Sequence, residues 1–218
     1  ITCSAVTLNS SSGNGVVLFS STVNSAASAA NPLTVSAGSG NVTFTGAVGG
    51  AANGARGALT INSSGTTTFS AAVTAASVTT DSAGTTALNG GTITTTGAQT
   101  YNDAVTLGAA TTLTSSSSGA INLASTVNGA QTLTINTAGA TTFGGIVGGT
   151  TPLTSITTDA AGTVVINGGA VTTSGTQTYN EAATLGANTT LSASGITTGS
   201  TMAAGSNAIT LTTDALDL

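Results

Sequence analysis

The chain is built from internal repeats, and the longest of them occurs twice. Residues 79–113 and 157–191 are identical at 24 of 35 positions, and both copies carry TTD, AGT, NGG, QTYN, TLGA and TTL in the same order. A further segment, residues 59–69, aligns with residues 133–143. A fixed period indicates an architecture of stacked units, because one such unit buries its apolar face only against its neighbours.

A smaller unit with the pattern G-x-x-x-(F/L/I)-x-x-x-V recurs within these repeats. It begins at Gly15, Gly40, Gly65, Gly84, Gly119, Gly139 and Gly162. Its fifth position holds Phe19, Phe44, Phe69, Leu88, Leu123, Phe143 and Ile166, and its ninth holds Val23, Val48, Val73, Thr92, Val127, Val147 and Ala170. The interval from Gly84 to Gly119 is much longer than the others. We interpret QTYNDAVTLGAATTL, inside this long interval, as an extra coil.

Apolar and polar residues alternate inside each unit, as strands require. In the strand around Val42 and Phe44 these two side chains point one way, and Thr43 and Thr45 point the other. Units of about 20 residues predict an all-β, right-handed parallel β-helix (a β-solenoid), with residues 1–218 forming one domain. We expect roughly eleven coils, a rod of about 50 Å, and one shared apolar column for all seven units. An antiparallel β-sandwich is the competing fold, but its turn signals recur about every 8–12 residues.

The composition agrees with stacking and excludes several functions. Only 3% of residues are charged, and the chain has one basic residue, Arg56, six acidic residues and no His. A charge repeated on every coil would face its own copy in the next coil, whereas the 49 Thr residues face one another without repulsion. Nucleic acid is excluded as a partner because phosphate binding needs clustered Lys and Arg. A basic membrane-surface patch is excluded for the same reason.

Targeting signals and cysteine chemistry are sparse in this sequence. No apolar run is long enough to predict a transmembrane helix, and no signal peptide is recognisable. Cys3 is the only cysteine, so no disulfide forms within the chain, and we interpret Cys3 as a small buried apolar residue. The repeat pattern reaches both ends of the sequence. We therefore expect an excerpt of a longer protein or, alternatively, a subunit that polymerises end to end.

Three segments resemble the repeats of a known family. GAQTYNDAVTLGAATTLT, NGAQTLTINTAGATTFGGIVGG and TTDAAGTVVINGGAVTTSGTQTYNEAATLG are similar to repeats of giant bacterial adhesins related to filamentous haemagglutinin. The resemblance covers nearly the whole chain and is closest over residues 65–191. It implies a right-handed parallel β-helix, two-partner or autotransporter secretion, a place on the bacterial cell surface, and a role in adhesion or biofilm.

The sequence predicts no catalytic, cofactor-binding or metal-binding residues. Nucleophilic catalysis by Ser or Cys needs a base, and the chain has neither His nor Lys; zinc sites need Cys or His ligands. The six carboxylates are Asp81, Asp103, Asp159, Glu181, Asp214 and Asp217. The pairs Asp81/Asp103 and Asp159/Glu181 have the same separation in sequence, close to the length of one coil, so each pair could lie on neighbouring coils. A glycosidase dyad or a calcium site is one interpretation; turn residues copied with the repeat is the interpretation that we favour.

Two further residue types suggest surface binding. Tyr101 and Tyr179 occupy the same repeat position and could stack on sugars, although we expect them to pack at a coil corner. The spacing Thr-x-Thr is a design for ice binding on flat solenoid faces and occurs at Thr43/Thr45, Thr92/Thr94, Thr112/Thr114, Thr132/Thr134 and Thr210/Thr212. These pairs fall at different phases of the unit, which argues against one ice-binding face.

We therefore expect a non-catalytic segment of an extracellular adhesin or surface filament. Its partners would be neighbouring solenoid segments, copies of itself or surface glycans. A self-assembling fibre subunit and an ice-binding solenoid are the alternatives.

Overall fold

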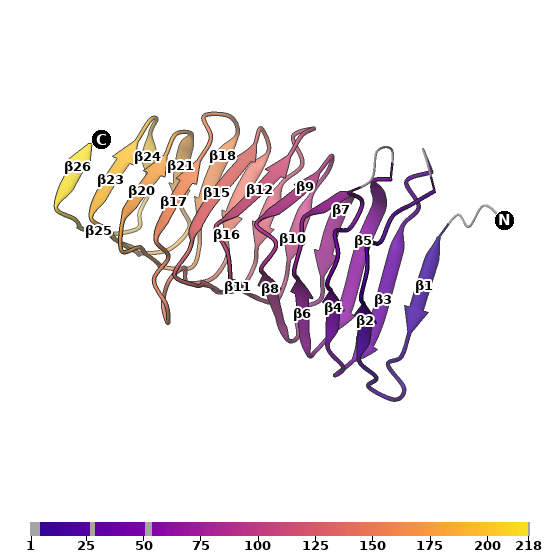
Figure 1. Ribbon diagram of the computed structural model, residues 1–218. Helices are drawn as coiled ribbons and strands as arrows, with labels where there is room; N and C mark the ends of the chain where they lie inside the picture. The colour runs from indigo at the N-terminus through magenta and orange to yellow at the C-terminus, as the bar shows by residue number, and fades with distance from the viewer. Residues whose placement is uncertain (1–4, 27–28, 51–53, 218) are drawn as a thin grey trace.

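The computed structural model describes residues 5–26, 29–50 and 54–217, and it is a parallel β-solenoid. Every strand pairing in it is parallel, and the strands lie side by side from β1 to β26 along one axis (Figure 1). The described residues contain no helix. The predicted fold class is confirmed, including the predicted length of the coils. Cys3 lies outside the described residues.

Each coil has three sides, and the strands of each side pair with those of the coils before and after. The first face comprises β1 (Val6–Asn9), β3 (Leu33–Gly38), β5 (Arg56–Ser63), β7 (Val73–Thr80), β10 (Gln99–Tyr101), β13 (Ile121–Leu123), β16 (Ala140–Phe143), β18 (Thr163–Ile166), β21 (Ala182–Leu185) and β24 (Met202–Ala203). The second face comprises β2 (Val17–Phe19), β4 (Val42–Phe44), β6 (Thr66–Phe69), β8 (Thr85–Leu88), β11 (Ala104–Leu107), β14 (Val127–Asn128), the bridge residue Val147, β19 (Ala170–Thr172), β22 (Thr189–Ser192) and β25 (Ile209–Thr212).

The third face joins the first one through strands that turn a corner. It comprises the bridge residues Val23 and Val48, the first halves of β5 and β7, β9 (Thr92–Thr95), β12 (Thr111–Ser115), β15 (Thr132–Thr137), β17 (Ser155–Thr158), β20 (Thr176–Tyr179), β23 (Gly195–Thr198) and β26 (Ala215–Asp217). Because β5 and β7 each contribute to two faces, the first and third faces form one continuous sheet of 17 strands.

The spacing of the coils varies along the chain. Val6 pairs with Leu33, 27 positions on, and Leu33 pairs with Leu59, 26 positions on. Later steps on the first face are shorter, between the 19 positions from Leu59 to Val78 and the 23 from Thr141 to Val164. The ladder of the first face passes through ten strands, which is fewer than the eleven coils expected.

Side chains at alternate positions fill the interior in columns. On the second face the rings of Phe19, Phe44 and Phe69 stack with centroids 4.6 and 5.2 Å apart. Leu88 and Leu107 continue this column in register. Such columns arise because a parallel register places equal positions of neighbouring coils one above the other.

The prediction of one column shared by all seven units is wrong. The fifth positions of the first four units lie on the second face, in the column of Phe69 and Leu88. Those of the last three units, Leu123, Phe143 and Ile166, lie in a column on the first face. In two units the buried residue is the tenth rather than the ninth: Ile93 and Val171 are buried, and their neighbours Thr92 and Ala170 are not.

The long interval between two units causes this change of face. From Gly84 to Gly119 the chain forms five sides, β8 to β12, whereas the following intervals contain three sides each. The segment interpreted as an extra coil, residues 99–113, forms β10, β11 and β12, one strand on each face, and the whole interval is two sides longer than the others. All later units consequently begin two faces further along the chain's path round the axis, on the first face instead of the second.

Gly84 and Gly162, which occupy the same position in the two copies of the long repeat, show why the first position of the unit is glycine. Gly84 and Gly162 have positive φ angles of 84° and 89°, a conformation that residues with a Cβ atom rarely adopt. A Cβ atom there would also collide with the carbonyl oxygens of Gly65 and Gly139 in the preceding coil. The glycine thus allows the corner to turn and the coils to approach closely.

Replacing Phe69 with Asp tests the inner column. Phe69 is fully buried in the ring stack, so Phe69→Asp places an unpaired charge in the interior and is expected to destabilise the chain by several kcal/mol. Thr68→Asp is the matched control, since Thr68 points outward from the same strand. Thermal unfolding followed by circular dichroism measures both. A Phe69→Asp variant as stable as Thr68→Asp would contradict the solenoid core.

Candidate functional site: two buried carboxyl corners

The two tyrosines lie inside the solenoid, at equivalent positions of the long repeat. Tyr101 and Tyr179 are fully buried, and each hydroxyl donates a hydrogen bond of 3.1 Å to the Oε1 atom of Gln99 or Gln177. The predicted packing at a coil corner is confirmed. Because neither ring reaches the surface, neither stacks on a sugar in this structure.

The glutamine beside each tyrosine satisfies backbone groups in the interior. The Nε2 atom of Gln99 donates to the carbonyl oxygens of Ile93 (3.2 Å) and Thr114 (2.9 Å). Gln177 makes the same pair of bonds, to Val171 and Ser192, both at 3.0 Å. Each glutamine thus links two neighbouring coils, a role that the shared QTYN motif could have indicated but that sequence reasoning missed.

Asp103 follows the first tyrosine and points into the corner between the first and second faces. Its carboxylate accepts a hydrogen bond of 2.6 Å from Thr80 Oγ1, and bonds of 2.8 and 3.0 Å from Thr86 Oγ1. The side chain is only 2% exposed. Burial raises the pKa of Asp103, the two hydroxyls act to lower it, and the charge of Asp81 adds a further increase. We call this group, Thr80, Thr86 and Asp103, the Asp103 corner.

Glu181 occupies the equivalent place in the second copy, but its surroundings differ. Val164 stands where the first copy has Thr86, so one of the two hydroxyl donors is missing. Glu181 is 3% exposed, and no well-aligned hydrogen bond reaches either of its carboxyl oxygens, although the Thr158 hydroxyl lies near enough to favour the charged form. Burial raises its pKa to about 7; the charge of Asp159 adds to the increase, and Thr158 acts in the opposite direction. We call Thr158, Val164 and Glu181, with the adjacent Asp159, the Glu181 corner.

The two corners lie on different edges of the solenoid. Asp103 connects β10 of the first face to β11 of the second, whereas Glu181 connects β20 of the third face to β21 of the first. From one corner to the other the chain passes through eleven sides, β11 to β20 with the Val147 segment, and eleven sides are three turns and two thirds. The structure therefore does not bring the two carboxyl pairs together.

Within each pair, the placement on neighbouring coils is confirmed. Asp103 reaches back to Thr80, the residue before Asp81, and β20, just before Glu181, pairs with β17, just before Asp159. A glycosidase dyad needs two carboxyl groups that contact a sugar. Asp103 and Glu181 are enclosed by their corners, so in this structure neither carboxyl can reach a polysaccharide. The remaining carboxylates, Asp214 and Asp217, lie at the C-terminal coil.

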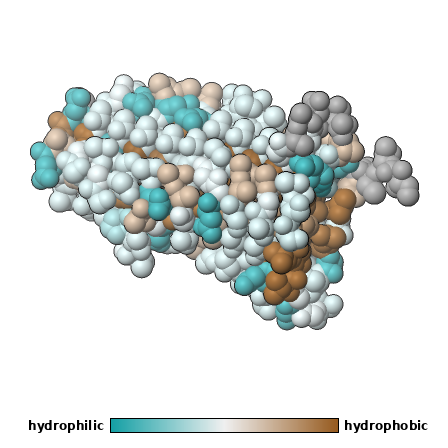
Figure 2. Space-filling view, in the orientation of Figure 1, coloured by the Kyte–Doolittle hydropathy of each residue, from teal (hydrophilic) through white to brown (hydrophobic). Residues whose placement is uncertain are grey.

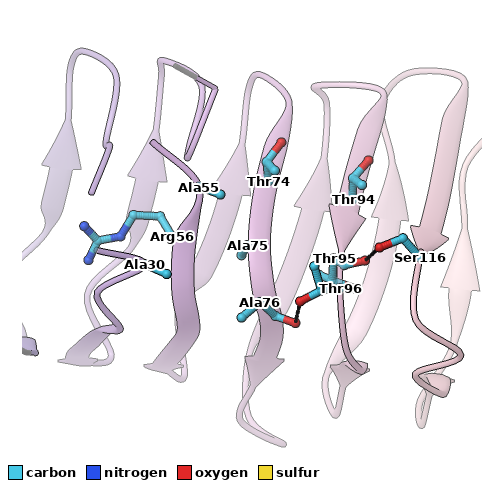
Figure 3. A pocket seen from close by; sticks show the side chains of 10 residues that line it. All are labelled: Ala30, Ala55, Arg56, Thr74, Ala75, Ala76, Thr94, Thr95, Thr96 and Ser116. Atoms are coloured by element: carbon cyan, nitrogen blue, oxygen red, sulfur yellow. Dashed lines mark hydrogen bonds between the residues drawn. The ribbon is translucent and has the colours of Figure 1, made fainter. Parts of the chain in front are cut away.

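The only basic residue lies beside a small surface hollow. Arg56 is buried and donates from Nη1 to the carbonyl oxygen of Asn24 at 3.2 Å. The hollow, of about 150 Å³, is lined largely by alanine and threonine, including Ala75 and Thr95. In Figure 3 the guanidinium points away from Thr74 and Thr94, the threonines on the other side of the hollow. Although Arg56 is among the lining residues, most of the hollow is formed by methyl and hydroxyl groups.

Outward threonines form a continuous row on the third face. The strand registers place them in six consecutive coils, in the order Thr92, Thr112, Thr134, Thr157, Thr178 and Thr197. A second row beside it holds Thr74, Thr94 and Thr114. The five Thr-x-Thr pairs do not share one phase, since Thr43/Thr45 and Thr210/Thr212 belong to the second face, but two pairs on the third face do align. Thr92/Thr94 and Thr112/Thr114 are in register, and Thr132/Thr134 is displaced by only two positions.

The comparisons with known proteins give no relative. No family model matches the chain, and no curated protein or solved structure matches it either. Over the part of the chain that the structure describes, no helix is long and apolar enough to cross a membrane.

Exchanging the residues that distinguish the two corners tests whether a hydroxyl at this position stabilises the buried carboxyl group. Thr86→Val removes a hydroxyl from the buried Asp103 carboxylate and is expected to destabilise the chain by about 1–3 kcal/mol. The midpoint of thermal unfolding should fall by several degrees. The reverse change, Val164→Thr, gives Glu181 a hydroxyl partner and should leave the midpoint unchanged or raise it. Equal effects of the two substitutions would show that the hydroxyl has no part in stabilising the carboxyl.

Proposed function

We propose that the chain is a structural, non-catalytic segment of an extracellular bacterial adhesin or surface filament, in which it forms a rigid shaft. The observation that carries this proposal is the continuous ladder of the first face, from β1 to β24. Each coil is held by main-chain hydrogen bonds to the coils on both sides, so length is added without a new core. The resemblance to adhesin repeats supports the same role.

The surface chemistry agrees with a passive shaft. Most of the face seen in Figure 2 is close to neutral in hydropathy, without a large strongly apolar area along the middle coils. Thr ladders suit such a surface, because a hydroxyl can donate to its copy in the next coil; Thr66 and Thr85, for example, lie 3.2 Å apart through their Oγ1 atoms. Surface glycans or neighbouring segments would be the partners of this shaft.

Electron microscopy and solution scattering test the proposal on the purified chain. Nine steps of about 4.8 Å along the ten strands of the first face give a rod about 43 Å long. Rods of this fixed length over a concentration series are the expected result. A compact particle without a long axis would contradict the shaft.

End-to-end assembly into a fibre is the alternative within this class. Apolar side chains are exposed at both outermost coils, Leu8, Val16 and Leu18 at one and Ile209 and Leu216 at the other. The brown area over the N-terminal coils in Figure 2 marks the first of these edges. Filaments that lengthen with protein concentration, in the same series, would favour a fibre subunit over a fixed rod.

Ice binding is a second candidate, favoured by the Thr rows of the third face. Hydroxyls there repeat about every 4.8 Å between coils and about every 6.6 Å along a strand. If this face binds ice, dilute protein shows thermal hysteresis, and Thr157→Tyr in the middle of the longer row abolishes it. Thr68→Tyr on the second face, where the row is interrupted by Leu18 and Ala87, is the control that should keep it. Wild-type protein without hysteresis would remove this candidate.

A further inference from the structure

The unsatisfied polar atoms of the interior gather in one place. Among the described residues, five buried side-chain nitrogen or oxygen atoms lack a hydrogen-bond partner. Four of them belong to the Glu181 corner: Thr158 Oγ1, Asp159 Oδ1, and both carboxyl oxygens of Glu181. The fifth, Arg56 Nε, lies in β5. Since buried polar groups in folded proteins nearly always have partners, four orphaned oxygens together call for an explanation.

The Asp103 corner shows that this arrangement is not a necessary property of the repeat. There the same topology satisfies the carboxylate with the hydroxyls of Thr80 and Thr86. The second copy has exchanged one hydroxyl for the methyl groups of Val164 and has lengthened the carboxyl side chain by one methylene. Both changes leave oxygen atoms without donors, so the second corner offers acceptors that the first does not.

The strand register brings these oxygens close together. Thr158 at the end of β17 lies opposite Tyr179 in β20, and Glu181 follows two residues later. In the Asp103 corner the equivalent threonine and carboxylate are 2.6 Å apart. Asp159 follows Thr158 directly, and its charge acts on the Glu181 carboxyl. The only cationic side chain, Arg56, contacts Asn24 in the N-terminal coils and cannot neutralise this corner.

We propose that Thr158, Asp159 and Glu181 bind a hard divalent cation of the size of calcium between β17 and β20. The donors are all oxygen atoms, two carboxyl groups and a hydroxyl, which is the set that calcium takes, including a carboxylate that can bind through both oxygens. Magnesium suits the corner less well, because it demands near-ideal octahedral geometry. The bound ion would supply the positive partner that Glu181 lacks and would tie one coil to the next.

The donor count sets the expected affinity. No three His, Cys, Asp or Glu side chains among residues 5–26, 29–50 and 54–217 lie close enough to form a metal cluster. The proposed site supplies only two carboxyl groups and one hydroxyl, fewer oxygen donors than the roughly six to eight that calcium takes. Dissociation constants of about 10⁻⁴–10⁻³ M, as in extracellular calcium modules, are expected.

Terbium luminescence and calorimetry test the site on the intact chain at a pH of about 8, above the raised pKa of Glu181. Terbium is the probe because it replaces calcium, and Tyr179, two residues before Glu181, can sensitise its emission. The chain has no Trp and two tyrosines, so excitation is confined to Tyr101 and Tyr179. We expect Tyr-sensitised terbium emission that calcium displaces, and titration with calcium chloride should give one site per chain.

Variants separate this corner from the rest of the chain. Glu181→Gln keeps the shape and removes the charge, and it should weaken calcium binding at least about tenfold. Asp159→Asn, at a half-buried position, should weaken it as well and guards against a folding defect in the first variant. Asp103→Asn in the Asp103 corner is the matched control and should leave binding unchanged. Far-UV circular dichroism checks that each variant is folded.

Three results would overturn the proposal. One is wild-type protein that gives neither terbium emission nor calcium heat at this pH, where the Glu181 carboxyl is ionised. Another is binding that Glu181→Gln and Asp159→Asn leave intact. The third is a loss of binding in Asp103→Asn equal to that in Glu181→Gln. None of these results bears on the rod length, so the proposed shaft stands or falls separately.

Discussion

Main-chain hydrogen bonding between successive coils is the interaction on which the rest of this structure depends. Every strand pairing is parallel and, apart from a bulge in β3 between Ser36 and Gly38, keeps its register, so positions of one coil lie over those of the next, about 4.8 Å away. This spacing favours columns of like residues. It permits the ring stack of Phe19, Phe44 and Phe69 inside and rows of threonine outside. It also disfavours repeated charge, which accounts for a chain in which 3% of residues are charged.

The long repeat does not contain a whole number of coils, so its two copies do not present the same residues on the same face of the solenoid. A repeat of three turns and two thirds places its second copy one face round from the first. Identical motifs therefore lie on different edges, as the Asp103 and Glu181 corners do. Conversely, threonines from different places in the repeat come into line, as Thr112, Thr134 and Thr157 do on the third face. A surface pattern in such a chain follows the register of the coils and not the period of the sequence.

The two corners show how one interior position can take different chemistry. A buried carboxyl is tolerated in the Asp103 corner because two hydroxyls donate to it. With Val164 in place of one hydroxyl, the Glu181 carboxyl is either neutral or paired with a cation from solution, and its raised pKa reflects the cost of holding the charge alone. A polar position within a repeat can thus acquire a ligand requirement without any change in the fold.

The sequence by itself determined the fold class. The recurring glycines, the alternation around Val42 and Phe44, and the scarcity of charge predicted a parallel solenoid and the length of its coils, and the burial of Tyr101 and Tyr179 at coil corners followed from their shared position. Only the tertiary structure decided which residues share a column, because the face on which a unit lies depends on the number of sides before it. Two extra sides between Gly84 and Gly119 moved Phe143 away from the column of Phe69 and brought the threonines of the third face into register. The unsatisfied oxygens of the Glu181 corner were also beyond the sequence, since they depend on how β17 and β20, which belong to neighbouring coils, place Thr158 and Glu181.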